Sequence, residues 1–240
     1  MSNQLGERLA GTDSVLPSAA ERYVIAEQQG LRLAIICRTA IAAAGLIYLL
    51  AVTAVTEYDI RTASMVALAI FVITGIGHIS VIGTRYDRWW LKFAIYALDV
   101  IIICALFVII PISRAHEVPQ IIAFRAYGIY YLFPFVIMSA LSLSWRLVIW
   151  TGAVAVVSWW AAFLWVVSDM EQTYSWADIP PAATRADYEN IFLSIDFIGR
   201  GNRIEETGFL FVGALILALV VYRACKVFFA QIEAEEIQRQ

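Results

Sequence analysis

Histidine, cysteine and proline are scarce in this chain of 240 residues, which contains two, three and six of them. Cys37, Cys104 and Cys225 lie in separate apolar stretches without CxxC spacing, which argues against a disulfide framework or a structural zinc site. His78 and His116 are expected at opposite ends of the bilayer, separated by much of its ~30 Å core. They are too far apart to be the two axial ligands of one iron, so a haem held by both histidines is not expected within one protomer. Ligation by one histidine, or across a dimer, stays open.

Catalytic motifs are lacking as well. The sequence has no Walker loop, no HExxH metal motif and no nucleophile elbow. GRGNR (199–203) has only one Gly pair and fits a turn before a helix better than a phosphate loop. Several acids are expected near the outer membrane boundary, but no spacing among them specifies a metal, so metal ligands are undetermined. The sequence therefore shows no catalytic motif and specifies no cofactor site.

Charged residues are few, at 15% of the chain, whereas hydrophobic residues make up 61% and the mean hydropathy is +0.75. A soluble domain of this length would be about one quarter charged. The excess of apolar side chains predicts an all-α fold, a polytopic membrane protein. The net charge of −3 gives no indication of a nucleic-acid partner.

Six stretches are long enough to cross the bilayer as helices, which takes about 20 residues each. They predict six transmembrane helices near 33–56, 63–84, 92–113, 120–143, 147–168 and 207–230. The predicted organisation is a cytoplasmic segment with a short amphipathic helix (1–31), a six-helix domain (32–230) and the start of a helical linker (231–240). Ser18 and Glu21 have the spacing of a capping box for that first short helix.

The basic residues predict the orientation. They crowd the short connections on one side, before the first span, after the second and fourth, and after the sixth. The positive-inside rule therefore places both termini in the cytoplasm. The one long connection, 169–206, then lies outside and is a candidate for sensing, although segments of this length are also found as plain structural or disordered loops.

Three ionisable residues are expected inside the spans at a similar depth, toward the cytoplasmic side. Arg38 lies six residues beyond Arg32, His78 seven before Arg85 and Asp99 seven beyond Lys92, which is about 10 Å of helix in each case. Buried charges of this kind usually face the bundle interior, so Arg38, His78 and Asp99 are predicted to form a polar network, with Asp99 contacting one of the other two. In the alternative interpretation Arg38 extends to the inner headgroups and His78 bonds a backbone carbonyl.

A second group is expected at the outer end of the fourth span. Arg125 and the three tyrosines after it share one helix, with the tyrosines at i, i+3, i+4 spacing. They suggest a pocket for an amphipathic ligand such as a quinone or a lipid; an aromatic belt is the alternative. The candidate pocket comprises Arg114, His116, Glu117, Arg125, Tyr127, Tyr130 and Tyr131.

Several phrases resemble a known family. WLKFAIYALDVIII (90–103), LSLSWRLVIWTG (141–152), DFIGRGNRIEE (196–206) and VYRACKVF (221–228) are similar to the N-terminal membrane region of bacterial class III adenylate and guanylate cyclases. The resemblance implies a homodimeric module of the bacterial inner membrane. It would anchor and regulate a cytosolic domain that makes cyclic AMP from ATP. The Mg or Mn ions and the catalytic residues of such an enzyme would belong to that further domain.

The last helix is expected to continue past the membrane as an output linker. Val221, Cys225, Phe228 and Ile232 recur at 4, 3 and 4, an apolar stripe suited to a parallel partner helix. Phe228 and Ile232 would pass the signal to a cytosolic partner. In the alternative interpretation this segment is a frayed, solvated helix end. A small ion or proton transporter, and a membrane anchor that binds quinone or haem, are the competing functions.

Overall fold

The computed structural model describes residues 19–55, 62–110, 118–125 and 128–239. This part of the chain is all-helical and contains no β-strand, apart from one isolated bridge between Tyr174 and Phe197. Five helices of this described part are long and apolar enough to cross a membrane. They are α2 (Ala19–Val55), α3 (Thr62–Val81), α4 (Leu91–Ile109), α7 (Trp145–Ser168) and α9 (Arg200–Arg239). The chain is therefore a membrane-embedded helical protein.

The fourth predicted span is not a single helix. Residues 121–140 instead form α5 (Ile121–Arg125), the 3₁₀ helix η1 (Gly128–Leu132) and α6 (Phe133–Ala140). Gly128 packs so closely that a Cβ there would lie 2.8 Å from the Trp159 ring and 2.9 Å from that of Phe107. Pro134 follows in the first turn of α6, where its missing N–H costs no helical hydrogen bond. A close approach and a proline thus divide a stretch that hydropathy alone reads as continuous.

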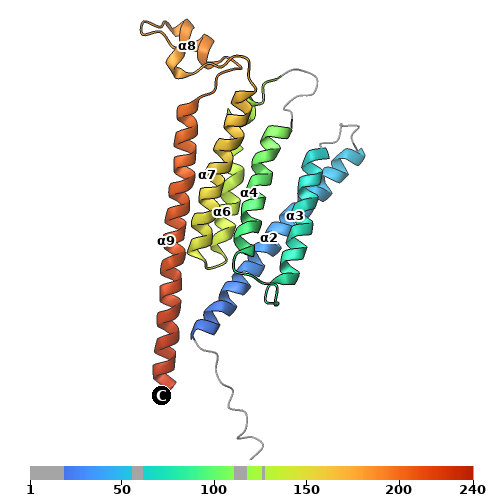
Figure 1. Cartoon of the computed structure of the whole chain (residues 1–240), viewed down its shortest axis with the longest axis vertical. Coiled ribbons are helices and arrows are strands. Elements are labelled where there is room, and N and C mark those ends of the chain that lie inside the picture. Colours follow the sequence, from blue (N-terminus) through green and yellow to red (C-terminus); the bar gives the residue numbers. More distant parts are fainter. Residues whose placement is uncertain (1–18, 56–61, 111–117, 126–127, 240) are drawn as a thin grey trace, which may run out of the picture.

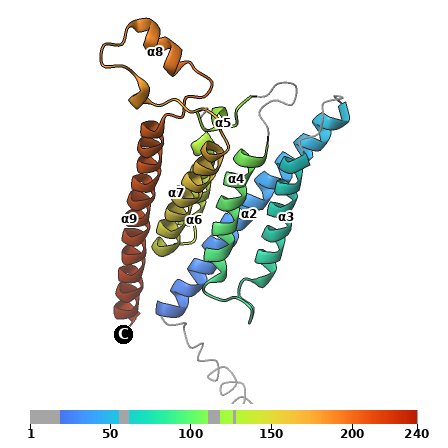
Figure 2. The same ribbon diagram turned by 45° about the horizontal axis from the view of Figure 1, so that its top comes forward.

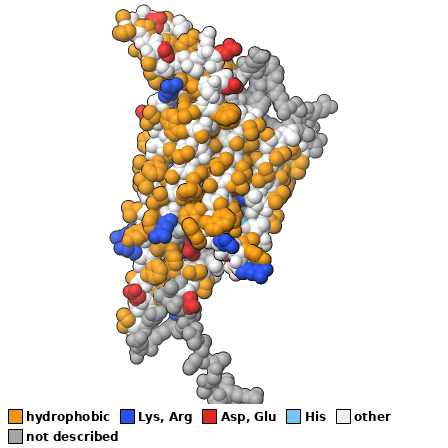
Figure 3. All heavy atoms as spheres, viewed as in Figure 1, with side chains coloured by type: hydrophobic (Ala, Val, Ile, Leu, Met, Phe, Trp, Pro, Cys, Tyr) orange, Lys and Arg blue, Asp and Glu red, His pale blue; other side chains and the backbone are white. Residues whose placement is uncertain are grey.

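The long helices are arranged side by side, with α9 at one edge and the α2–α3 pair at the other (Figure 1). α7 lies between α4 and α9, and its Trp159 and Phe163 are completely buried. The same order is visible after rotation (Figure 2). Hydrophobic side chains cover the middle of the molecule, and Lys and Arg side chains gather toward its lower part (Figure 3).

Both ends of the described chain lie on one side. Tyr23 of α2 stacks on Phe229 of α9 with ring centroids 5.0 Å apart, and Arg22 pairs with Glu235 at 3.5 Å. Residues 169–206, named the outer segment after the orientation predicted from the sequence, include η2 (Trp176–Asp178) and α8 (Arg185–Phe192) and lie at the opposite end of the bundle (Figure 1). The terms inner and outer below follow that predicted orientation. α2 is one helix from Ala19 onward, so no separate amphipathic helix precedes the first span within the described residues. The proposed cap at Ser18 lies outside them.

Candidate functional site

A buried ion pair joins α2 to α4. Nη1 of Arg38 lies 2.6 Å from Oδ2 of Asp99, and the two side chains are 5% and 0% exposed. The contact that the residue depths predict is therefore present. Arg38 does not extend to the headgroups, because its guanidinium is held inside the bundle.

The second nitrogen of Arg38 binds α3. Nη2 donates to the backbone carbonyl of Phe71 at 3.0 Å and to Oγ1 of Thr74 at 2.6 Å. Thr74 in turn donates its hydroxyl proton to the carbonyl of Ile70. The guanidinium also lies over the Phe71 ring, with 5.6 Å between its carbon and the ring centroid. One arginine thus links three helices through polar contacts, which makes it the centre of the site.

His78 is buried nearby on α3 but takes no part in these bonds. Neither ring nitrogen has a hydrogen-bond partner among the described residues, and the same is true of Nε of Arg38 and Oδ1 of Asp99. The alternative in which His78 bonds a backbone carbonyl is therefore not observed. Several buried polar atoms consequently retain unused hydrogen-bonding capacity.

The outer candidate pocket is described only in part. Arg114, His116, Glu117 and Tyr127 lie outside the described residues. Arg125 does not join the tyrosines: it donates to the carbonyls of Ser194 and Phe192, at 2.8 and 3.0 Å. These carbonyl groups lie at the C-terminal end of α8. A cation is favoured there by the helix dipole and by the carbonyl oxygens that have no partner within the helix. Tyr130 and Tyr131 are mostly exposed in η1 and pack beside Phe133 and Phe107.

A second arginine, which the sequence did not single out, links the same region to α9. Arg203 is 4% exposed, donates to the carbonyl of Phe124 in α5, and pairs with Glu206 at 2.8 Å. Since Arg125 follows Phe124 directly, α5 is bonded to α8 on one side and to α9 on the other. The sequence signal that could have identified Arg203 is the presence of an arginine at the start of an apolar helix.

The inner ends of three elements meet at one carbonyl. Leu143, in the turn between α6 and α7, accepts hydrogen bonds from the Tyr23 hydroxyl at 2.9 Å and from Sγ of Cys225 at 3.2 Å. Its φ of 54° is left-handed, a conformation that costs a residue with a Cβ roughly 1–2 kcal/mol. We call Tyr23, Leu143 and Cys225 the inner clamp. It holds the start of α2 against the last third of α9.

The apolar stripe of α9 faces its own protomer. Val221, Cys225 and Ile232 are 5–8% exposed within a single chain, and Phe228 is half-buried. The stripe was expected to meet a partner helix, but the bundle and the start of α2 cover it first. The candidate output residues Phe228 and Ile232 therefore belong to the contact between α9 and the rest of the bundle.

Comparisons with protein-family models, curated proteins and solved structures found no match to this chain. Its function is therefore argued from its own geometry.

Proposed function

We propose that this protein is a membrane-anchoring sensor module that passes a signal from its outer segment through α9 to a cytosolic nucleotidyl cyclase domain. The observation that carries the proposal is α9 itself. It is one helix of 40 residues, Arg200–Arg239, about 60 Å long at 1.5 Å per residue. Such a helix exceeds the ~30 Å hydrocarbon core and connects the two sides of the membrane without a break.

Contacts at both ends of α9 support signal transmission. At the outer end, Arg203 bonds α5, and the adjacent Arg125 bonds the end of α8. At the inner end, Cys225 shares the Leu143 carbonyl with Tyr23. A displacement of α8 would therefore act on α9 through the hydrogen bonds of Arg125 and Arg203, and a shift of α9 would strain or release the inner clamp. Two packed arrangements of these contacts would provide the two states that a sensor requires.

The proposed output is a parallel homodimer of α9 beyond the membrane. The covered stripe is unavailable, but the opposite face carries Val220, Val227, Ala230, Ala234 and Ile237 at heptad-like spacing. Val227 and Ile237 are 55% and 73% exposed. The flanking Lys226 and Glu233 would face uncharged Gln231 and Gln238 of a second copy, so no like charges oppose the pairing. A class III cyclase domain of the resembled family would receive such a dimer, in the inner membrane of a bacterium with both termini cytoplasmic.

A fusion experiment tests this proposal. A soluble class III cyclase catalytic domain is joined in frame after Gln240 and expressed in a cyclase-deficient bacterium. Cyclic AMP is then measured for the parent fusion and for insertions after Ala234. Two added residues rotate the output by about 200°, whereas seven rotate it by about 700°, close to two full turns. The two-residue insertion should lower cyclic AMP at least fivefold and the seven-residue insertion should restore it; equal output from all three would contradict the proposal.

Proton or ion transport is a second candidate, favoured by the unpartnered atoms of His78 and Asp99 around the buried pair. This function predicts that the pH inside proteoliposomes changes when a membrane potential is imposed, and that Asp99→Asn stops the change. The sensor proposal predicts no difference from protein-free liposomes. A pH-sensitive dye trapped inside the vesicles distinguishes the two functions.

A further inference from the structure

Two hollows meet at the outer end of α4 and α7. The first is a polar hollow of about 630 Å³ between the end of α7, the residues before α5 and the end of the outer segment. The second is an apolar groove of about 380 Å³ between α4 and α7. Val108 and Trp165 line both, so one leads directly into the other. Together they form a site with a polar head and an apolar tail.

The groove faces the hydrocarbon region. Its walls run from Ile101 to Ile109 on α4 and from Val157 to Trp165 on α7, about 12 Å along each helix. Val157 and Trp165 are 68% and 69% exposed, so the groove is open to lipid along its length. Its lining includes the small residues Ala105, Ala161 and Ala162. This shape fits a single alkyl chain inserted from the outer boundary.

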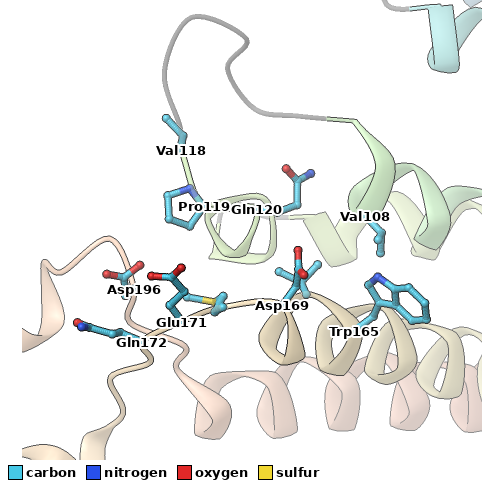
Figure 4. A pocket seen from close by; sticks show the side chains of 11 residues that line it. Val108, Val118, Pro119, Gln120, Trp165, Asp169, Glu171, Gln172 and Asp196 are labelled. Atoms are coloured by element: carbon cyan, nitrogen blue, oxygen red, sulfur yellow. The ribbon is translucent and has the colours of Figure 1, made fainter.

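The polar hollow presents hydrogen-bond acceptors. Asp169, Glu171 and Asp196 contribute carboxylates to its described lining, which includes no Lys, Arg or His (Figure 4). Gln120 donates its amide nitrogen to the carbonyls of Phe107 and Ile110, which leaves its side-chain oxygen as an acceptor. The described side of the hollow therefore favours a ligand with hydrogen-bond donors or positive charge.

The walls of the hollow are tied together. Tyr174 donates to the Asp196 carbonyl at 3.0 Å, and Ile198 donates to the Tyr174 carbonyl at 2.8 Å. This bridge fixes the start of the outer segment, just after Glu171 and Gln172, beside its end. Figure 4 shows Asp169 directly after the end of α7, with Glu171 and Asp196 on the backbone segments beyond it. The arrangement is thus set by backbone bonds and does not need a ligand to assemble it.

How closely the carboxylates converge decides whether the hollow suits a metal ion or a larger organic cation. No group of three acidic, histidine or cysteine side chains in the described residues converges closely enough to hold a metal ion. An organic ammonium group is larger and accepts dispersed carboxylates. Trp165, at the junction of hollow and groove, offers an indole face of the kind that attracts such cations.

We propose that this composite site binds a single-chain cationic amphiphile. Its ammonium headgroup lies among Asp169, Glu171 and Asp196, and its alkyl chain lies in the groove between α4 and α7. The inference names a ligand class for the sensor proposed above and rests on that proposal for its signalling meaning. Binding itself requires no cyclase, so the two proposals fail separately.

The test uses the purified full chain in nonionic maltoside micelles. Dodecyltrimethylammonium below its own micellar concentration is the probe, and dodecanol, with the same chain and no charge, is the comparison. Calorimetric titration should give saturable binding of the ammonium compound only. Asp169→Asn/Glu171→Gln should weaken it at least tenfold, whereas Glu205→Gln, an exposed acid of α9 outside the hollow, should leave it within twofold.

A second pair of variants tests the groove. Ala161→Phe fills it and should abolish binding, whereas Leu164→Phe, on the same helix but outside the lining, should not. Equal binding of dodecanol, or unchanged binding by Asp169→Asn/Glu171→Gln, overturns the proposal. Saturable displacement of the probe by micromolar Ca²⁺ overturns it too, since the hollow would then be a metal site. If binding follows the proposal but the probe leaves cyclic AMP unchanged in the fusion, only the signalling function fails.

Discussion

The buried charge of Arg38 is stabilised by several partners at once. Removing an ion pair from water costs several kcal/mol per ion, and attraction offsets this only when the remaining donors are also satisfied. Arg38 meets much of this condition through three bonds, to Asp99, Thr74 and the carbonyl of Phe71, while its Nε and Oδ1 of Asp99 have no partner among the described residues. Because these partners belong to two different helices, the arginine fixes how α2, α3 and α4 sit together.

Replacing one partner of this ion pair should destabilise the bundle more than replacing both partners. We expect Arg38→Met to lower stability by about 3–5 kcal/mol, since it leaves Asp99 buried without a counter-charge. The double variant Arg38→Met/Asp99→Leu should recover at least half of that loss. Unfolding in mixed micelles, followed by tryptophan fluorescence, measures both. A double variant that is no more stable than Arg38→Met would contradict the ion-pair interpretation.

Part of the inner site follows from the sequence alone. Counting residues from the flanking basic positions placed Arg38 and Asp99 at one depth, and an ion pair is the cheapest way to bury both. Thr74 and the carbonyl of Phe71 did not stand out, because an ordinary threonine and a backbone group carry no pattern. The inner clamp was equally unpredictable, since the left-handed turn at Leu143 depends on tertiary contacts from α2 and α9.

At the scale of elements, the contact of α7 with α9 depends on one glycine. A Cβ on Gly152 would lie 2.5 Å from that of Ala214, so the helices can approach this closely only without it. We expect Gly152→Ala to lower the midpoint of thermal unfolding by several degrees. Gly77→Ala, where a Cβ would meet nothing within 4 Å, is the matched control and should have no such effect. Equal unfolding midpoints for Gly152→Ala and Gly77→Ala would show that α9 can move away from α7 without a loss of stability.

The helix α8 is stabilised by a capping box that depends on pH. Thr184 accepts from the Asp187 backbone N–H, while Asp187 accepts from the Thr184 backbone N–H and hydroxyl, and these bonds hold the pKa of Asp187 below its usual range. A lowered pKa in the folded state means that this stabilisation is complete above the unfolded pKa of about 3.9. It is lost as the pH falls through the folded value.

We therefore expect residues 185–192 to lose hydrogen-exchange protection below about pH 3.9, after correction for intrinsic rates. Asp187→Asn should remove most of this pH dependence, and Thr184→Ala should reduce protection at neutral pH by an amount corresponding to about 1 kcal/mol. Asp178 has the same arrangement with Ser175, in η2, and provides an internal comparison. Constant protection of α8 across this range would contradict the capping role.

The sequence predicted the long helices well but not the segment between α4 and α7. Hydropathy reports how apolar a stretch is, and residues 120–143 are mostly apolar, with Arg125 as the one charged residue. It does not report that the Trp159 and Phe107 rings occupy the space beside Gly128, or that a 3₁₀ turn follows. The same limit explains the stripe on α9: its spacing indicated a packed face, and only the fold shows that the partner is the protein itself.

At the scale of the whole molecule, the side of the membrane on which each segment lies follows from the number of times that the chain crosses the bilayer. The described residues hold five helices long enough to cross, and we expect the interrupted segment 121–140 to make a sixth crossing between α4 and α7. Six crossings would bring the end of α9 back to the side on which α2 starts, in agreement with the stacking of Tyr23 on Phe229. A chain in which 121–140 did not cross would separate these rings by the width of the membrane.

Single added cysteines test this topology in intact cells, in a background where Cys37, Cys104 and Cys225 are replaced by Ala or Ser. We expect Ala177→Cys, in the outer segment, to react with a membrane-impermeant maleimide without permeabilisation. Ala234→Cys, exposed near the end of α9, should react only after the inner membrane is opened. Because Ala177 and Ala234 are both exposed alanines, their intrinsic reactivity is comparable and the membrane alone makes the difference. Labelling of both positions in intact cells would place the end of α9 outside and would remove the basis for a cytosolic output.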